Sequence, residues 1–195
     1  MAKIYVIMGK SSSGKDTVYS HLKECVSPKF NTVVMYTTRP MREGECDGRE
    51  YYFTDEKAVQ RLEDEGKIIE LRAYNTVHGE WKYFTVDDGQ IDVNSNNNYL
   101  IIATLEAYKK YLSYYGKDVV IPIYIEVEDG IRIHRALARE DKQEQPKYAE
   151  MCRRFLADEL DFSEEKIMEL DIGIRYNNKD LQECISNILA DVNKC

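Results

Sequence analysis

Residues 9–17 read Gly-Lys-Ser-Ser-Ser-Gly-Lys-Asp-Thr, between the apolar run Ile4–Met8 and a segment with helical periodicity. The spacing G-x-x-x-x-G-K after a short buried strand lets a tight turn point its amides at a phosphate group. Gly9 and Gly14 permit close approaches that a β-carbon would block. The following helix adds the positive end of its dipole, and Lys15 adds a point charge. A Gly/Ser-rich loop that binds nothing is the alternative, but strand, loop, lysine and helix in register favour a loop that binds nucleotide phosphates.

The position after Lys15 departs from this pattern, because it holds Asp16 where Ser or Thr normally ligates Mg²⁺. A carboxylate is a hard oxygen ligand that binds Mg²⁺ directly or through water. It also brings negative charge close to a triphosphate, and we expect Lys10 to offset part of it. The sequence therefore predicts Mg²⁺ bound with the nucleotide, with Asp16 and Thr17 as candidate ligands.

A second signature, TTRPMREGECDGREYYF, occupies residues 37–53. Arg39 and Arg42 lie three residues apart, and neither has an obvious neighbouring acid to neutralise it. Planar guanidinium groups suit a phosphate monoester better than Lys does, and the hydroxyl of Tyr51 can donate to the same phosphate. Solvated surface charge is the alternative for any single arginine. The combination predicts a second phosphate site, for a monophosphate acceptor.

The form TTRPxRxGExDGxxYxF is typical of guanylate kinases, and the chain resembles that family from the loop at 9–17 to Asn177. The resemblance implies an enzyme that transfers the γ-phosphoryl group of ATP to GMP with the help of Mg²⁺. The residues that it implies for ATP binding are Gly9, Ser11, Ser12, Ser13, Gly14, Lys15, Asp16, Thr17 and Asn177. The residues that it implies for GMP binding are Arg39, Arg42, Tyr51, Glu70, Tyr83 and Thr85. Among these, the carboxylate of Glu70 would accept hydrogen bonds from guanine.

A cluster of arginines follows later in the chain. Arg135 and Arg139 lie four residues apart on one helix face, and a polar hinge separates them from Arg153 and Arg154. Phosphoryl transfer needs positive charge around the transferred group, and this stretch resembles the mobile lid of the family. Pairing with nearby glutamates on the helix surface is the alternative. The expected catalytic set is Lys15, Arg39, Arg135, Arg139 and Arg154.

Several family positions are altered on the acceptor side. Met35 replaces a Ser that contacts guanine, Phe84 replaces a Gly, and Ile102 and Thr104 replace two aspartates. We therefore expect a weaker guanine preference than in a complete family site. Three functions stay open: a guanylate kinase, a kinase of another nucleoside monophosphate or phosphorylated small molecule, and a non-catalytic guanylate-kinase-like binding module. The retained phosphate loop favours the two kinases over the binding module.

Strands and helices alternate along the chain, which predicts an α/β fold with a parallel sheet flanked by helices. By resemblance this is a P-loop NTPase-type sheet with an inserted small α+β acceptor-binding lobe and a helical lid. We expect the core at about 1–36, 87–130 and 165–195, the acceptor lobe at about 37–86 and the lid at about 131–164. The expected strands are 4–8, 31–36, 68–74, 83–86, 99–103, 119–127 and 172–176. The expected helices are 15–25, 54–65, 105–115, 131–139, 147–170 and 180–192.

Composition narrows the class of protein further. The 195 residues include 27 basic and 35 acidic side chains, a net charge of −8, which argues against a non-specific nucleic-acid binder. Five cysteines without C-x-x-C pairs indicate free thiols in a reducing compartment. No apolar run approaches the ~18 residues of a membrane span, and the first segment is a strand and not a signal peptide. We expect a cytoplasmic enzyme with ATP and GMP as partners and with no nucleic acid or membrane; its oligomeric state stays open.

Overall fold

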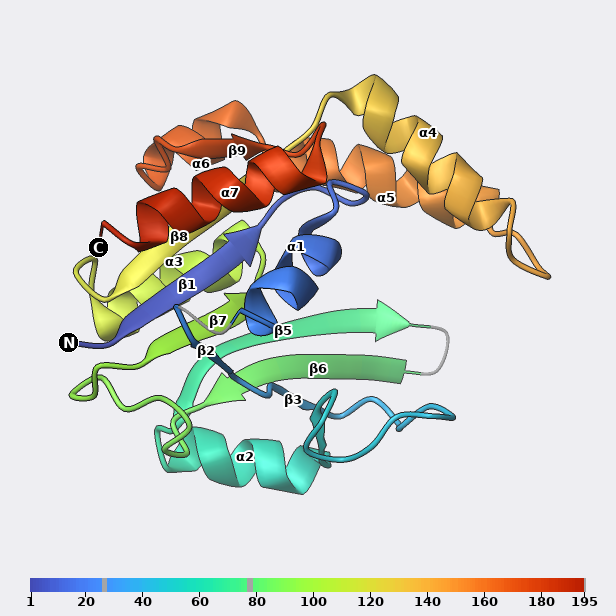
Figure 1. Ribbon diagram of the computed structural model, residues 1–195. Coiled ribbons are helices and arrows are strands. Elements are labelled where there is room, and N and C mark those ends of the chain that lie inside the picture. Colours follow the sequence, from blue (N-terminus) through green and yellow to red (C-terminus); the bar gives the residue numbers. More distant parts are fainter. Residues whose placement is uncertain (26–27, 77–78, 195) are drawn as a thin grey trace.

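The computed structural model describes residues 1–25, 28–76 and 79–194, shown in Figure 1. Its centre is a five-stranded sheet in the order β2-β7-β1-β8-β9, and every neighbouring pair in it is parallel. The strands of this sheet are β1 (Lys3–Met8), β2 (Phe30–Thr32), β7 (Asn98–Ile102), β8 (Val120–Glu126) and β9 (Arg175–Asn177). The expected P-loop α/β fold is confirmed.

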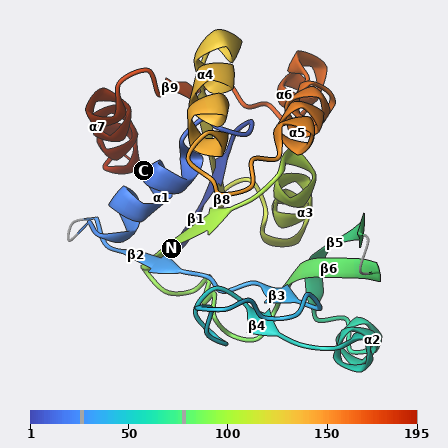
Figure 2. The ribbon, with the colours of Figure 1, turned by 90° about the vertical axis from the view of Figure 1, so that its right-hand side faces the viewer.

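Helices cover both faces of this sheet, as Figure 2 shows from the side. They include α1 (Lys15–Lys23), α3 (Leu105–Tyr115) and α7 (Leu181–Val192). Successive side chains of a strand point to opposite faces, so β1 contributes to two separate cores. Ile4 and Val6 pack with Tyr108 of α3, whereas Ile7 packs with Val18 of α1 and with α7. Because β1 is buried on both sides, it holds the loop that follows Met8 on a rigid support.

A second, four-stranded sheet in the order β4-β3-β6-β5 forms a separate layer. Its elements are β3 (Tyr36–Thr37), β4 (Tyr52–Phe53), β5 (Ile68–Thr76) and β6 (Gly79–Val86), with α2 (Glu56–Asp64) packed on one face. Strands β5 and β6 form a long antiparallel hairpin. Helix α2 begins at Asp55, whose carboxylate accepts from the amide of Ala58 at 2.9 Å. The helix expected over 54–65, with Thr54 as the predicted cap, therefore begins later and is capped by the next residue along the chain.

A helical pair projects beyond the end of the main sheet in Figure 1. It consists of α4 (Asp129–Glu140) and α5 (Tyr148–Asp161), and α6 (Glu164–Glu169) follows. We expected one helix over 147–170, and the structure corrects this. The chain leaves the helix at Phe162, whose ring is buried in the core, and Ser163 caps α6 by accepting from the amide of Lys166. Burial of Phe162 therefore takes precedence over helix continuity.

The expected strand 31–36 is also divided. Strand β2 ends at Thr32 and β3 begins at Tyr36, and the two belong to different sheets. Between them, Val34 exchanges its backbone hydrogen bonds with the side-chain amide of Gln90, at 2.8 and 3.0 Å. That side chain replaces a strand partner, so the segment passes from one sheet to the other. The expected strand 172–176 is observed only as Arg175–Asn177, and the expected turn at His78 lies outside the described residues.

Candidate active site

The phosphate loop between β1 and α1 has the backbone shape that its glycines predict. Gly9 has a φ of 152°, and a β-carbon there would lie 2.5 Å from the carbonyl oxygen of Ile125. Gly14 has a φ of 87°, and a β-carbon there would collide with the side-chain amide of Asn178. Ser12 adopts a left-handed φ of 62°, which is uncommon for a residue with a side chain. The tightly curled loop therefore has local backbone strain at Ser12.

Several polar atoms of the loop are buried without a partner in the described chain. They are the hydroxyl oxygens of Ser12 and Ser13 and the Oδ1 atom of Asn178. Asn178 also donates to the carbonyl of Ser13 at 2.8 Å, so its side chain is fixed against the loop. Buried polar groups normally have partners. The two serine hydroxyls can donate to an anion, and a curled loop at a helix N-terminus favours one.

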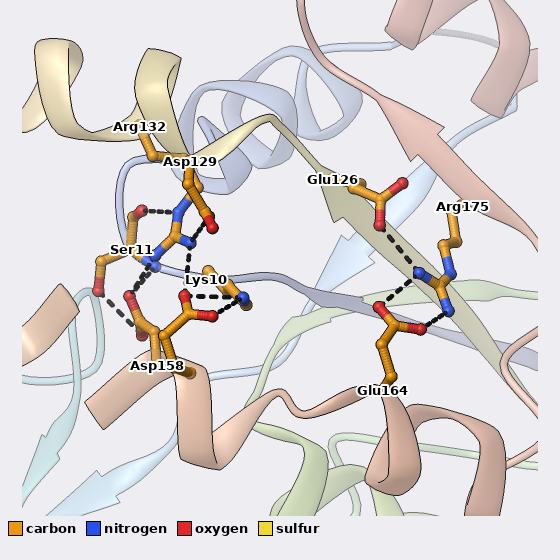
Figure 3. A network of polar contacts seen from close by, with 9 residues as sticks. Lys10, Ser11, Glu126, Asp129, Arg132, Asp158, Glu164 and Arg175 are labelled. Carbon is orange, nitrogen blue, oxygen red and sulfur yellow. Dashed lines mark hydrogen bonds and ion pairs between the residues drawn. The ribbon is translucent and has the colours of Figure 1, made fainter. Parts of the chain in front are cut away.

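The loop is held from outside by a buried arginine that the sequence analysis missed. Arg132 of α4 is 1% exposed, and its guanidinium donates to the carbonyl of Ser11 at 3.1 Å and to Asp158 at 2.9 Å (Figure 3). Asp158 of α5 in turn accepts from the amide of Ser11 at 2.8 Å. Asp129 supplies a further carboxylate 2.6 Å from the same guanidinium. The loop, α4 and α5 therefore share one network of charges, centred on the buried Arg132.

Lys10 also belongs to this network. Its ammonium lies 2.8 Å from both carboxylate oxygens of Glu159. The expectation that Lys10 offsets the charge of Asp16 is therefore wrong: the lysine is neutralised by a lid carboxylate. The hydrogen bond from Lys10 is also the main cause of the lowered pKa of Glu159.

The three lid arginines occupy different environments. Arg135 donates to the carbonyl of Asn178 at 2.9 Å, beside the phosphate loop. Arg139 is exposed, and its side chain makes no hydrogen bond or ion pair with the described residues. Arg154 is exposed and donates to Glu150 at 2.8 Å. The structure therefore brings one of the three arginines to the loop, and it pairs another with a surface glutamate.

In the acceptor lobe, Arg39 has an acidic partner that the sequence analysis did not find. Its guanidinium makes two hydrogen bonds with Glu45, at 2.8 and 2.9 Å, and it lies 5.5 Å from the ring of Tyr51. The amide of Arg42 donates to the same carboxylate at 2.7 Å. Because of the bonds from Arg39 and then Arg42, the pKa of Glu45 is lowered to about 2. The expectation of two unneutralised arginines is therefore wrong for Arg39, since the loop folds back on itself.

A cleft of about 620 Å³ lies between the main sheet and the second sheet. Lys15 and Asp16 line it from α1, while Tyr51 and Tyr83 line it from the side of the second sheet. The two tyrosine rings meet edge to face with centroids 5.6 Å apart, and burial raises the pKa of Tyr51. The lysine of the first signature and the tyrosine of the second therefore face one cavity, although they lie 36 positions apart in the chain.

The base-reading carboxylate implied by the resemblance is covered by another side chain. Glu70 accepts from Arg72 at 2.9 and 3.2 Å and from the hydroxyl of Thr85 at 3.1 Å. That hydroxyl also lies 2.6 Å from the hydroxyl of Tyr111. Arg72 lines the 620 Å³ cleft, and Glu70 lies beneath it with 1% of its side chain exposed. The cleft therefore presents a guanidinium where a carboxylate was expected.

Comparison with known proteins identifies the family. The guanylate kinase family model matches residues 1–145. The chain belongs to the guanylate kinase family. It is 41% identical over 78 residues to a guanylate kinase of Aromatoleum aromaticum and 40% identical over 85 residues to one of Oleidesulfovibrio alaskensis. These alignments cover 40% and 44% of this chain, and 36% and 39% of the relatives' own length.

The fold extends beyond these local alignments. The crystal structure of a guanylate kinase from Anaplasma phagocytophilum matches with a TM-score of 0.63 and 23% identity, over 99% of this chain and 85% of that one. The match to the family model confirms the family resemblance based on the two signatures. Within the described residues, no helix of this family member is long and apolar enough to cross a bilayer, and no group of three or more His, Cys, Asp or Glu side chains forms a metal site.

Sequence patterns could have indicated some of the missed residues. Arg72 follows Glu70 by two positions in a predicted strand, and the alternation of side chains along a strand places both on one face. Asn178, which donates to the loop, directly follows the predicted site residue Asn177. The side chain of Asn177 is exposed and accepts from the amide of Lys179. Nothing in the sequence pattern of the family member indicates that Arg132 is buried, because two of its three acidic partners, Asp158 and Glu159, are on a different helix.

Proposed function

We propose that the protein transfers the γ-phosphoryl group of ATP to GMP, giving ADP and GDP. The observation that supports this most directly is that Lys15 and the pair Tyr51 and Tyr83 line the same cleft. A donor phosphate held by the loop and an acceptor phosphate held by the tyrosines would meet there. Such a reaction depends mainly on positioning and on stabilisation of the developing charge, which two facing phosphate sites supply.

The ATP side of this proposal rests on the phosphate loop. The amides of Ser12, Gly14 and Lys15 make no hydrogen bond with the described chain, so they remain available to phosphate oxygens. The residues proposed for ATP binding are Gly9, Ser11, Ser12, Ser13, Gly14, Lys15, Asp16, Thr17 and Asn177. Ser11 contributes by anchoring the loop, since its amide is used by Asp158. Arg135, Arg139 and Arg154 would complete the positive charge when the lid closes.

The acceptor side of the proposal rests on residues 39–45, a loop that folds back so that Glu45 binds Arg39 and Arg42. We call this segment the arginine loop. Arg39, Arg42, Tyr51 and Tyr83 are proposed to hold the phosphate of GMP. Glu45 orders this loop in advance by binding both arginine residues, and such ordering lowers the conformational cost of binding. Glu70 and Thr85 are proposed to act at the base end of the cleft.

Magnesium is proposed as the cofactor, bound with ATP. Asp16 lines the cleft in the first turn of α1, and its carboxylate makes no hydrogen bond with the described residues. One free carboxylate beside a phosphate loop fits Mg²⁺, which is held by one or two protein oxygens and by substrate phosphates. Thr17 is the second candidate ligand. When bound, the ion neutralises charge on the transferred phosphoryl group.

A cytoplasmic location belongs to the same proposal. The described cysteines Cys25, Cys46, Cys152 and Cys184 are free thiols. Free thiols are the usual state of cysteines in a reducing compartment, which supports this location.

The test is a coupled assay that follows ADP release with ATP–Mg²⁺ and a panel of GMP, AMP, CMP and UMP. We expect ADP release with GMP, and at most slow release with the other three nucleotides. Release with AMP, CMP or UMP at the rate for GMP would favour the second candidate function, a kinase of another monophosphate. The covering of Glu70 by Arg72 is the observation that keeps this candidate open. Tight nucleotide binding without ADP release would favour the binding module.

A further inference from the structure

The base end of the cleft is built on one face of the hairpin β5–β6. Glu70 and Arg72 are two residues apart on β5, opposite Thr85 and Tyr83 of β6. Residues two apart on a strand share a face, so the pair Glu70 and Arg72 lies on the side that faces the cleft. The side chain of Arg72 is 13% exposed and that of Glu70 only 1%. Arg72 thus forms the surface, and Glu70 lies behind it.

Both oxygens of the Glu70 carboxylate are already occupied. Oε2 accepts from Nε of Arg72 at 2.9 Å, and Oε1 accepts from Nη2 of Arg72 and from the hydroxyl of Thr85. For guanine to donate its N1–H and 2-amino groups to this carboxylate, the guanidinium would first have to leave. Separating a buried, hydrogen-bonded ion pair is strongly unfavourable because it leaves an unpaired charge. The geometry therefore keeps Glu70 away from the base.

The outer edge of the Arg72 guanidinium, formed by Nη1 and Nη2, has only one weak partner among the described residues, the thioether sulfur of Met35, which a ligand can displace. Of its N–H groups, two donate to Glu70 and one points at the sulfur of Met35, 3.7 Å from Nη2. Nη1 makes no hydrogen bond with the described residues. A guanidinium donates and never accepts, so it selects a base that presents acceptors. The O6 and N7 atoms of a 6-oxopurine form such a pair of acceptors, and Arg commonly donates to both.

We infer that Arg72 is the residue that reads the base, that Glu70 is a positioning residue that holds Arg72, and that the acceptors are 6-oxopurine nucleoside monophosphates without a required 2-amino group. This inference rests on the proposed function, because it concerns the acceptor site of that reaction. It distinguishes IMP, which lacks the 2-amino group but keeps O6 and N7, from AMP, which presents an amino group at position 6. IMP is accepted about as well as GMP, and AMP is rejected.

Calorimetric binding of GMP, IMP and AMP to the parent protein is the first test, and it does not depend on turnover. We expect dissociation constants for GMP and IMP within about threefold and AMP binding about ten- to hundredfold weaker, the range for one bidentate contact. A preference for GMP over IMP of about thirtyfold or more would overturn the inference, because the 2-amino group would then be read. If the 6-oxopurines bind as expected but no ADP is released, the proposed function fails and the inference stands.

Two variants distinguish a residue that contacts the base from a residue that only positions Arg72. Glu70→Gln is expected to weaken GMP and IMP binding by the same factor, because both depend on Arg72. Selective loss of GMP binding would show that Glu70 reads the base itself. Arg72→Ala uncovers Glu70, so the preference for GMP over IMP is expected to rise by about tenfold or more, which a merely structural loss would not produce. If this variant does not fold by circular dichroism, the parent panel and Glu70→Gln still decide the question.

The matched control is Asn75→Ala, on the opposite face of β5. Asn75 is exposed and does not line the cleft. We expect its affinities for all three nucleotides to equal those of the parent. A change there equal to that of Arg72→Ala would mean that the hairpin as a whole, and not the guanidinium, sets selectivity, which would also overturn the inference.

Discussion

Asp158 accepts hydrogen bonds from both the amide and the hydroxyl of Ser11, at 2.8 and 3.2 Å, across 147 positions of sequence. One carboxylate of lid helix α5 thus fixes the start of the phosphate loop, and Arg132 compensates its charge from the other side. This relationship joins the loop that would hold ATP to the lid that would close over it. A change in the position of α5 therefore acts directly on the loop.

Replacing Asp158 by Ala is expected to destabilise the fold. The substitution removes two hydrogen bonds to Ser11 and one partner of the buried Arg132, which keeps Asp129 and Glu159. We expect the free energy of unfolding to fall by about 2–4 kcal/mol, as for a partly broken buried charge pair. Urea denaturation measures it. Asp161→Ala, a substitution at a nearby exposed position, is the control. Its free energy of unfolding is expected within about 0.5 kcal/mol of the parent value. Equal effects of the two changes would contradict the anchoring role.

Lys15→Ala is expected to abolish phosphoryl transfer and to leave the fold intact. Loss of one positioned charge in a preorganised site costs roughly 3–4 kcal/mol of barrier, or about a hundred- to a thousandfold in rate. ADP release with ATP and GMP measures the rate, and circular dichroism checks the fold. Lys110→Ala, on the exposed side of α3, serves as the control with a parental rate. A rate for Lys15→Ala within a few fold of the parent would show that this loop is not the catalytic centre.

Asp16 is expected to set the magnesium requirement. Asp16→Ser restores a hydroxyl ligand at this position and should be tolerated, whereas Asp16→Ala should raise the Mg²⁺ concentration needed for half-maximal rate. Titration of the rate with Mg²⁺ at fixed ATP measures both variants. A nucleotide complex in which Asp16 turns away and Thr17 alone approaches the ion would contradict the assignment.

Glu45 is expected to stabilise the arginine loop in a pH-dependent way. Its pKa falls from an ordinary value of 4.5 to about 2 because Arg39 and the amide of Arg42 donate to it. A carboxyl group with a lowered pKa stabilises the folded state fully above its unfolded value, and this contribution is lost as the pH falls towards 2. The stability difference between parent and Glu45→Gln should therefore be constant above about pH 5.5 and shrink between about pH 4.5 and 2. Thermal denaturation across this range measures it, with a substitution of the exposed neighbour, Glu43→Gln, as the control variant.

The acceptor lobe and the lid are expected to approach each other when both substrates bind. Arg139 and Arg154 lie away from the phosphate loop, and they reach the phosphoryl group only after closure. Cys46 in the acceptor lobe and Cys152 on α5 are exposed and free, so a pair of labels placed there reports the change after the other cysteines are replaced by Ser. The distance should shorten with a bisubstrate dinucleotide and change less with ATP alone. An unchanged distance with the dinucleotide would refute closure.

The main strands and the phosphate loop were predictable because their signals are local. The apolar run Ile4–Met8, the glycines of the loop and the alternation of strands and helices each lie within a few residues. The predictions that failed concern whether a strand or a helix continues without a break. The strand expected over 31–36 is divided because Gln90 replaces its partner strand, and the helix expected over 147–170 ends where Phe162 enters the core. Both causes lie at positions that periodicity alone does not connect.

The sequence by itself determined the family and the P-loop fold, since these depend on short motifs with fixed backbone requirements. Only the tertiary structure decided which charges are free. Arg39, Lys10 and Glu70 looked available in the sequence, yet each is paired in the fold, with Glu45, Glu159 and Arg72 respectively. The physical reason is that a charge removed from water needs a partner of opposite sign. In two of these cases the partner lies close by in the chain, but only the folded backbone turns the two side chains toward each other.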